Sequence, residues 1–154
     1  MTLDEFKEKY LGQPVNFDGA YPEQCVDLVQ MYNKEVIGAP AWNGDAHTYA
    51  RNPEPSHYEY HKNTPLYIPP KGAIAVWNSK VGYGHGHTAI VLSAGLMSFT
   101  SIDQNWVDVK RCTIVTHTYT NVDCFLVPRG ESIDKVYNQL VGDLQTLAQK
   151  YHKV

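Results

Sequence analysis

The strongest constraint on the fold is a series of short apolar or alternating runs in the second half of the chain. After Pro69-Pro70 these runs read AIAVWN, HTAIVLSA, MSFTSIDQNW, RCTIVTHTY and DCFLVPR, with Gly, Asn or Asp residues near their ends. Runs of this length, rich in β-branched and aromatic residues and bounded by turn formers, are typical of antiparallel strands. They predict one strongly curved antiparallel sheet of about five or six strands.

The first half of the chain carries helical patterns instead. Thr2 followed by Glu5 is a capping-box signature and predicts a helix over residues 3–11. Apolar residues at helical spacing predict a second helix over residues 23–36. Residues 38–70, rich in Pro, Asn, His and Tyr, are expected to form loops and short helical turns. Helices followed by a meandering sheet indicate an α+β fold.

The composition excludes several classes of protein. A chain of 154 residues with 43% hydrophobic residues suits one domain with its own core. A net charge of −3 without a Lys/Arg cluster argues against a nucleic-acid partner. No apolar run approaches the roughly 20 residues of a transmembrane segment. Three irregularly spaced cysteines imply no disulfide framework and no thiolate zinc site, so Cys112 and Cys124 are expected in the core.

Cys25 lies at the predicted start of the second helix, directly after a Pro-Glu-Gln run. The positive end of a helix dipole favours the thiolate form of a cysteine at this position. Taken alone, the position fits a buried small hydrophobe, a metal ligand or a nucleophile. A suitable base elsewhere in the sequence would favour the nucleophile.

His87 is the histidine best placed to be that base. It opens the predicted strand HTAIVLSA, where an imidazole can be held rigidly beside a helix terminus, whereas Gly86 indicates that His85 points elsewhere. The other histidines lie in predicted loops, in a strand or at the tail: His47, His57, His61, His117 and His152.

The next run, SIDQNWVDV, supplies polar side chains at the end of a predicted strand. These are Asp103, Gln104 and Asn105. A carboxylate or amide here can orient an imidazole through its second nitrogen, as an array of nucleophile, base and orienting group requires.

Three stretches, FDGAYPEQCVDL, GHGHTAIV and IDQNW, in this order resemble the CHAP domain (cysteine, histidine-dependent amidohydrolase/peptidase) of bacteriophage endolysins. PPKGAIAVW also resembles the segment that leads into the family's first core strand, and the likeness covers residues 10–130. It implies a papain-like, NlpC/P60-type fold with N-terminal helices packed on the curved sheet. It also implies the following site residues: Cys25 as nucleophile, His87 as general base, Asn105 as orienting residue, Asp103 as a supporting or alternative one, and Gln24 as a contributor to the oxyanion site.

The loop before Cys25 has the spacing of a calcium loop. Its candidate ligands stand at positions one, three, five, seven and twelve: Asn16, Asp18, Ala20, Pro22 and Asp27. The loop is not an EF-hand, since its glycine is at position four rather than six. Several CHAP endolysins carry a calcium loop of this layout, so the resemblance implies Ca²⁺ in a structural or regulatory role. The alternative is an Asp/Asn-rich turn that caps the helix.

The C-terminal segment predicts an amphipathic helix within residues 131–154, following a catalytic domain over residues 1–130. Its apolar residues recur at steps of three and four: Ile133, Val136, Leu140, Leu144, Leu147 and Tyr151. We expect this helix to link the catalytic domain to a C-terminal wall-binding domain or subunit. The alternatives are a helix that packs back on the domain and an association helix.

The resemblance implies the catalytic domain of a phage endolysin that lyses the host by cleaving peptidoglycan through a cysteine thioester. The enzyme would be an N-acetylmuramoyl-L-alanine amidase or a peptidoglycan endopeptidase. The alternatives are an NlpC/P60-type cysteine peptidase acting on another amide and a catalytically silent wall-binding module. The acidic N-terminus is not a secretory signal, so we expect synthesis in the host bacterial cytoplasm and access to the wall after membrane permeabilisation.

Overall fold

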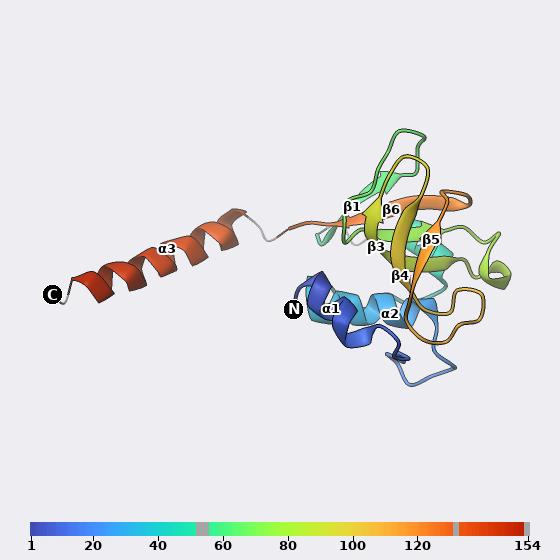
Figure 1. Ribbon diagram of the computed structural model, residues 1–154, viewed down its shortest axis with the longest axis horizontal. Helices are drawn as coiled ribbons and strands as arrows, with labels where there is room; N and C mark the ends of the chain where they lie inside the picture. Colours follow the sequence, from blue (N-terminus) through green and yellow to red (C-terminus); the bar gives the residue numbers. More distant parts are fainter. Residues whose placement is uncertain (52–55, 131–132, 153–154) are drawn as a thin grey trace.

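A six-stranded antiparallel sheet, ordered β1-β6-β2-β3-β4-β5, forms the centre of the computed structural model, which describes residues 1–51, 56–130 and 133–152. The strands are β1 (Tyr58–Lys62), β2 (Ile74–Trp77), β3 (His87–Ala94), β4 (Phe99–Asp103), β5 (Thr113–His117) and β6 (Val122–Pro128). Figure 1 shows that the sheet is strongly curved. The α+β fold and the predicted sheet are confirmed.

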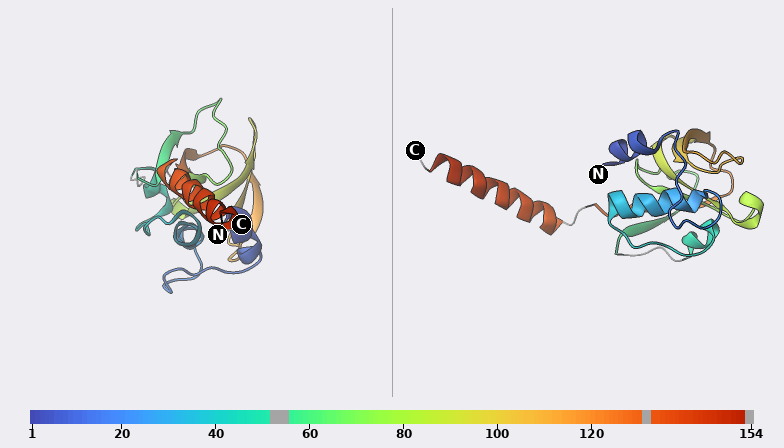
Figure 2. Two further views of the ribbon diagram at one scale, coloured as in Figure 1. Left: turned by 90° about the vertical axis from the view of Figure 1, so that its left-hand side faces the viewer. Right: turned by 90° about the horizontal axis from the view of Figure 1, so that it is seen from below.

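The two faces of the sheet bury different side chains, because successive residues of a strand point to opposite sides. One face packs against the helices α1 (Leu3–Tyr10) and α2 (Cys25–Tyr32), and Ile74, Val76 and Ile90 belong to this core. The other face carries Trp77, Phe99 and several alanines. Figure 2 shows both helices on one side of the sheet.

Local capping sets the start of both N-terminal helices. The Thr2 side chain accepts the N–H of Glu5, and the Glu5 carboxylate accepts the N–H of Thr2, as the sequence predicts. The helix α2 begins at Cys25, two residues later than expected, because Gln24 is extended. The helix then ends in a π-helical turn, Asn33–Ile37.

The expectation that residues 38–70 hold only loops and helical turns is wrong for β1. This edge strand pairs with β6, and Tyr58 is its only fully buried residue. Since a strand with one buried side chain shows no clear alternation, the pattern in YEYHK did not reveal it. A helical turn expected within this segment, around Gly44–Ala50, is a 3₁₀ helix, Ala46–Ala50.

The helix α3 (Ile133–Tyr151) stands apart from the other elements in Figures 1 and 2. Its apolar residues Leu140, Leu144, Leu147 and Tyr151 are all more than half exposed. The division into a catalytic domain and a linker helix stays a prediction, and residues 131–132 and 153–154 lie outside the described residues. Within the described ranges, no helix has both the length and the apolar character needed to cross a membrane.

Candidate active site

A cleft of about 1080 Å³ lies beside the first turn of α2. Four of the five catalytic candidates line it: Gln24, Cys25, His87 and Asn105. The fifth, Asp103, is completely buried behind His87. The fold therefore brings together side chains that lie up to 81 positions apart in the sequence.

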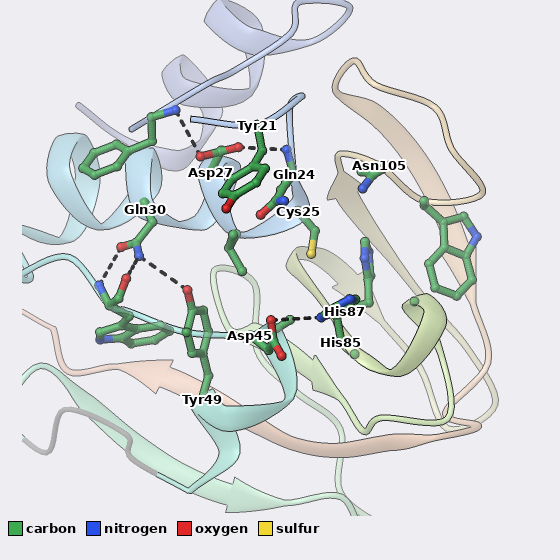
Figure 3. Close-up of a pocket in the computed structure, with 18 of the residues that line it drawn as sticks. Tyr21, Gln24, Cys25, Asp27, Gln30, Asp45, Tyr49, His85, His87 and Asn105 are labelled. Carbon is green, nitrogen blue, oxygen red and sulfur yellow. Dashed lines mark hydrogen bonds and ion pairs between the residues drawn. The ribbon is translucent and has the colours of Figure 1, made fainter. Parts of the chain in front are cut away.

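Cys25 is the first residue of α2, and its sulfur points toward His87 in Figure 3. Burial disfavours the thiolate. The hydrogen bond and charge of His87, together with the N–H and hydroxyl of Thr88, outweigh this effect and hold the pKa of the Cys25 thiol below its ordinary value. The free N–H groups of the first helical turn also favour an anion here. Cys25 is thus prepared to act as a thiolate.

His87 is held at the start of β3 by a turn that requires glycine. A Cβ atom on Gly86 would lie 2.7 Å from the N of His47 and from the O of Trp77, and Gly86 has φ of +78°. The His87 ring packs edge-on against Trp77, with 5.1 Å between ring centroids. Burial disfavours the imidazolium, but hydrogen bonds to Asp103 and Cys25 raise the pKa of His87 to about 9. These opposite shifts favour an imidazolium–thiolate pair.

Asp103 orients the His87 ring. Its Oδ2 lies 2.8 Å from Nε2 of His87, which leaves Nδ1 for the thiol. The same Oδ2 lies 2.9 Å from Nε2 of His117, and the hydroxyl of Ser101 donates to Oδ1 at 2.5 Å. Burial alone would raise the pKa of this carboxyl, but the two histidines hold it below its ordinary value.

Asn105 was expected to orient the imidazole, and the structure places it differently. Its backbone has φ of +61°, and its N–H donates to the O of Val109 at 2.7 Å. Its side-chain oxygen accepts a hydrogen bond from Lys110 at 2.5 Å. Because β4 ends at Asp103, Asn105 belongs to the following turn and lines the cleft. The hydrogen bond to the second nitrogen of His87 is made by the Asp103 carboxylate instead.

Gln104 fixes the backbone beneath the nucleophile. This fully buried amide accepts the N–H of Val15 and donates to the carbonyls of Val15 and Gln24, each at 2.7 Å. The residue before Cys25 is therefore tied to the end of β4. The Gln24 side chain is exposed at the cleft beside Cys25, and its role at the oxyanion site stays a prediction.

The rim of the cleft combines aromatic and charged side chains. Tyr83 is 90% exposed and Tyr21 is 78% exposed, and both line the cleft. His85 also lies at the rim, where its Nδ1 is 3.0 Å from a carboxylate oxygen of Asp45. Gly86 thus directs His85 to the rim and His87 to the thiol, as the sequence predicts.

The predicted calcium loop is closed by hydrogen bonds of its own side chains. Asn16 accepts the N–H of Gly19, and Asp18 accepts the N–H of Ala20, both at 2.8 Å. The carboxylate of Asp27 accepts the N–H groups of Phe17 and Gln24, at 3.2 and 2.8 Å.

The donor chemistry of this loop fits Ca²⁺, which prefers carboxylate, amide and carbonyl oxygens. Burial raises the pKa of Asp27, the hydrogen bonds to its carboxylate oppose this, and the negative charge of Asp18 adds to it. A cation between the two carboxylates would relieve that repulsion. Only two of the five predicted ligands are carboxylates, and no cluster of three or more His, Cys, Asp or Glu side chains suited to a metal occurs among the described residues.

A family model and curated relatives match this chain. A model of the CHAP domain matches residues 15–105. The chain is 34% identical over 108 residues to "Probable autolysin PH" of Staphylococcus aureus, covering 67% of this chain and 22% of that protein. It is 34% identical over 95 residues to "Endolysin LysK" of Staphylococcus phage K, covering 60% of this chain and 19% of that protein. The chain thus spans about a fifth of the length of these curated relatives.

The fold also matches solved structures. Wild-type endolysin LysIME-EF1 superposes with a TM-score of 0.72 at 25% identity, covering 86% of this chain and 66% of that one. Ly7917 superposes with a TM-score of 0.66 at 16% identity, covering 84% and 63%, which speaks for the fold alone. Together with the family model, these matches confirm the resemblance predicted from the sequence motifs: the chain belongs to the CHAP domain family.

Proposed function

We propose that this chain is the catalytic part of a peptidoglycan hydrolase, of the kind that phage endolysins use to lyse their hosts. The observation that carries the proposal is the Cys25–His87–Asp103 array at a cleft of about 1080 Å³. Relatives named autolysin and endolysin support the bacterial wall as substrate. The aromatic and polar lining of the cleft suits a glycopeptide.

The reaction would be acyl transfer through a thioester. The Cys25 thiolate attacks the carbonyl carbon of an amide, and the N–H groups at the start of α2 stabilise the oxyanion. Protonated His87 gives its Nδ1 proton to the leaving amine as the C–N bond breaks. His87 then accepts a proton from the water that hydrolyses the thioester, while Asp103 keeps the ring in place throughout.

Loss of turbidity of purified cell walls tests the function. The wild-type protein is expected to clear the walls, and Cys25→Ala and Cys25→Ser are expected to abolish clearing while thermal unfolding stays cooperative. A Cys25→Ala protein that clears walls would refute the assignment of Cys25 as the nucleophile. A folded wild-type protein that binds walls without clearing them would indicate the silent binding module instead. Mass spectrometry of the released fragments identifies the cleaved bond, whether the muramoyl–L-alanine amide or a peptide bond.

We also propose that the loop of residues 16–27 binds Ca²⁺ in a structural or regulatory role. The ligands would be the side chains of Asn16, Asp18 and Asp27 with the carbonyls of Ala20 and Pro22. A bound ion would add a tie between the loop and the helix that carries Cys25.

Calcium titration of the EDTA-treated protein tests this site. We expect Ca²⁺ to raise the melting temperature and the wall-clearing rate of the wild-type protein, and to raise neither in Asp18→Asn. Glu8→Gln, which removes an exposed negative charge on α1, is the matched control and is expected to respond like the wild type. If EDTA changes neither quantity in the wild type, the calcium site is refuted.

The exposed apolar residues of α3 support a further proposal, that this helix tethers the catalytic domain to a wall-binding domain or subunit. The protein would act on the wall from the host cytoplasm once the membrane is permeabilised. Lysis of expressing cells only after the membrane is breached is the expected result, and lysis from intact cells would contradict it.

A further inference from the structure

Two buried histidines share one oxygen of the Asp103 carboxylate. Nε2 of His87 and Nε2 of His117 lie 2.8 and 2.9 Å from Oδ2. His117 is 5% exposed and Asp103 is not exposed at all. The mechanism uses His87 and Asp103, but it assigns no role to His117.

The protonation of these groups follows from the geometry. An ionised carboxylate only accepts hydrogen bonds, so each Nε2 atom must carry a hydrogen that points at Oδ2. The Ser101 hydroxyl donates to the other oxygen of Asp103. His117 therefore supplies one of three donors that keep the dry carboxylate of Asp103 charged and prevent it from rotating.

Aromatic rings hold the His117 side chain in place. Its ring centroid lies 4.8 Å from that of Trp77 and 4.6 Å from that of Trp106, both nearly edge-on. The same two aromatic residues contact the ring of His87. Among the described titratable groups, Asp103 contacts His117 directly and His87 lies beyond it. Tyr119 packs on the Phe99 ring that also contacts His117, and Cys112 feels the charge of Asp103. Burial raises the pKa of Cys112 to about 12, so its thiol stays neutral.

We propose that His117 is a positioning residue that fixes the Asp103 carboxylate and thereby holds the His87 ring in the orientation in which it faces Cys25. The proposal rests on the proposed function only where it predicts the rate of wall hydrolysis. The state of the thiolate can be measured without any wall substrate.

Two substitutions of His117 separate the hydrogen bond from the packing. His117→Phe keeps a ring between the aromatic residues and removes the donor, whereas His117→Gln keeps a side-chain N–H donor and removes the ring. His61→Phe is the matched control, because His61 on β1 also pairs with a carboxylate, at 3.0 Å from Glu59, and stacks on the ring of Tyr67. Each protein is alkylated with iodoacetamide over a pH series, with Cys25→Ser as the blank, and its kcat and KM are measured on purified walls.

In His117→Phe we expect the acid limb of the alkylation profile to move up by at most about one pH unit. The lost hydrogen bond acts on Asp103 and reaches the thiol only through the orientation of His87, and a hydrogen bond to a charged group shifts the pKa of that group itself by about one unit. We expect kcat to fall about tenfold with KM changed less than twofold, as for an interaction that acts on the reacting groups. His117→Gln is expected to restore both the limb and most of kcat. His61→Phe is expected to behave as the wild type.

The proposal is overturned if His117→Phe leaves the acid limb in place, or if His117→Gln is as defective as His117→Phe. If the acid limb of the alkylation profile shifts in His117→Phe while the wild-type protein fails to clear walls, that result would support the positioning role and refute the proposed function. Normal wall clearing with an unshifted limb would do the opposite.

Discussion

Replacing Thr88 by Val is expected to weaken the thiolate of Cys25 without weakening the fold. Thr88 follows His87 on β3 and is completely buried on the face that packs against α2, as alternation with Ile90 requires. Its buried hydroxyl makes no hydrogen bond to another group of the described residues. It does help to lower the pKa of the Cys25 thiol and so stabilises the thiolate. The hydroxyl therefore contributes to the charge of the nucleophile and little else.

The two opposing free energies set the size of the effect. A hydrogen bond to a charged group contributes about 1.5–3 kcal/mol, and about 1.4 kcal/mol corresponds to one pKa unit. Cys25 is only partly buried, so the lower end of this range applies and the thiol pKa should rise by about one unit. Burying an unpaired hydroxyl costs about 1–3 kcal/mol, so its replacement by a methyl group of the same shape should leave the fold as stable or slightly more stable.

The pH dependence of Cys25 alkylation measures the thiol pKa, and thermal unfolding measures the stability of the same samples. The buried thiols of Cys112 and Cys124 have pKa values raised to about 12, so they do not interfere near neutral pH. Thr88→Ser, which keeps the hydroxyl, is the matched control and should keep the wild-type thiol pKa while losing stability. An unchanged thiol pKa in a well-folded Thr88→Val protein would refute the reasoning.

Asp103→Ala is expected to lower the rate of wall hydrolysis at least a hundredfold, because Asp103 fixes the catalytic ring, whereas Asn105→Ala should lower it less than fivefold; equal losses would contradict this assignment. The rate of wall hydrolysis should rise with pH as the Cys25 thiol ionises, at a pH below the ordinary pKa of a thiol. It should fall above about pH 9 as His87 loses its proton, so a rate that still rises at pH 10 would contradict the ion pair. Gln104→Leu leaves three backbone groups without their buried partner, so it should destabilise the protein by about 3 kcal/mol in a denaturant titration. A loss below about 1 kcal/mol would show that water replaces the amide.

The features predicted from the sequence are those encoded in adjacent residues. The Thr2–Glu5 capping box, the strand runs and the helix-start position of Cys25 each depend on a few neighbouring side chains, and the structure has all three. The orienting residue was less predictable. Asp103 and Asn105 are two residues apart and would share a face if β4 continued, so the choice depended on where the strand ends.

His117 could not be assigned from the sequence for a different reason. RCTIVTHTY shows that this histidine lies in a strand, but the pairing of β5 with β4 and the curvature of the sheet decide what the side chain meets. The same holds for Gln104, whose partners are backbone groups near residues 15 and 24. Neither contact leaves a local pattern, since both depend on segments brought together only by the folded sheet.

In the proposed calcium site, one carboxylate of the loop would serve two purposes. Asp27 already ties the loop to the helix, because its two oxygens accept the N–H groups of Phe17 and Gln24. Each oxygen has a second lone pair, so a cation could bind without breaking either bond. Calcium would then stiffen a connection that the chain makes by itself, and the metal would tune the catalytic helix rather than create it.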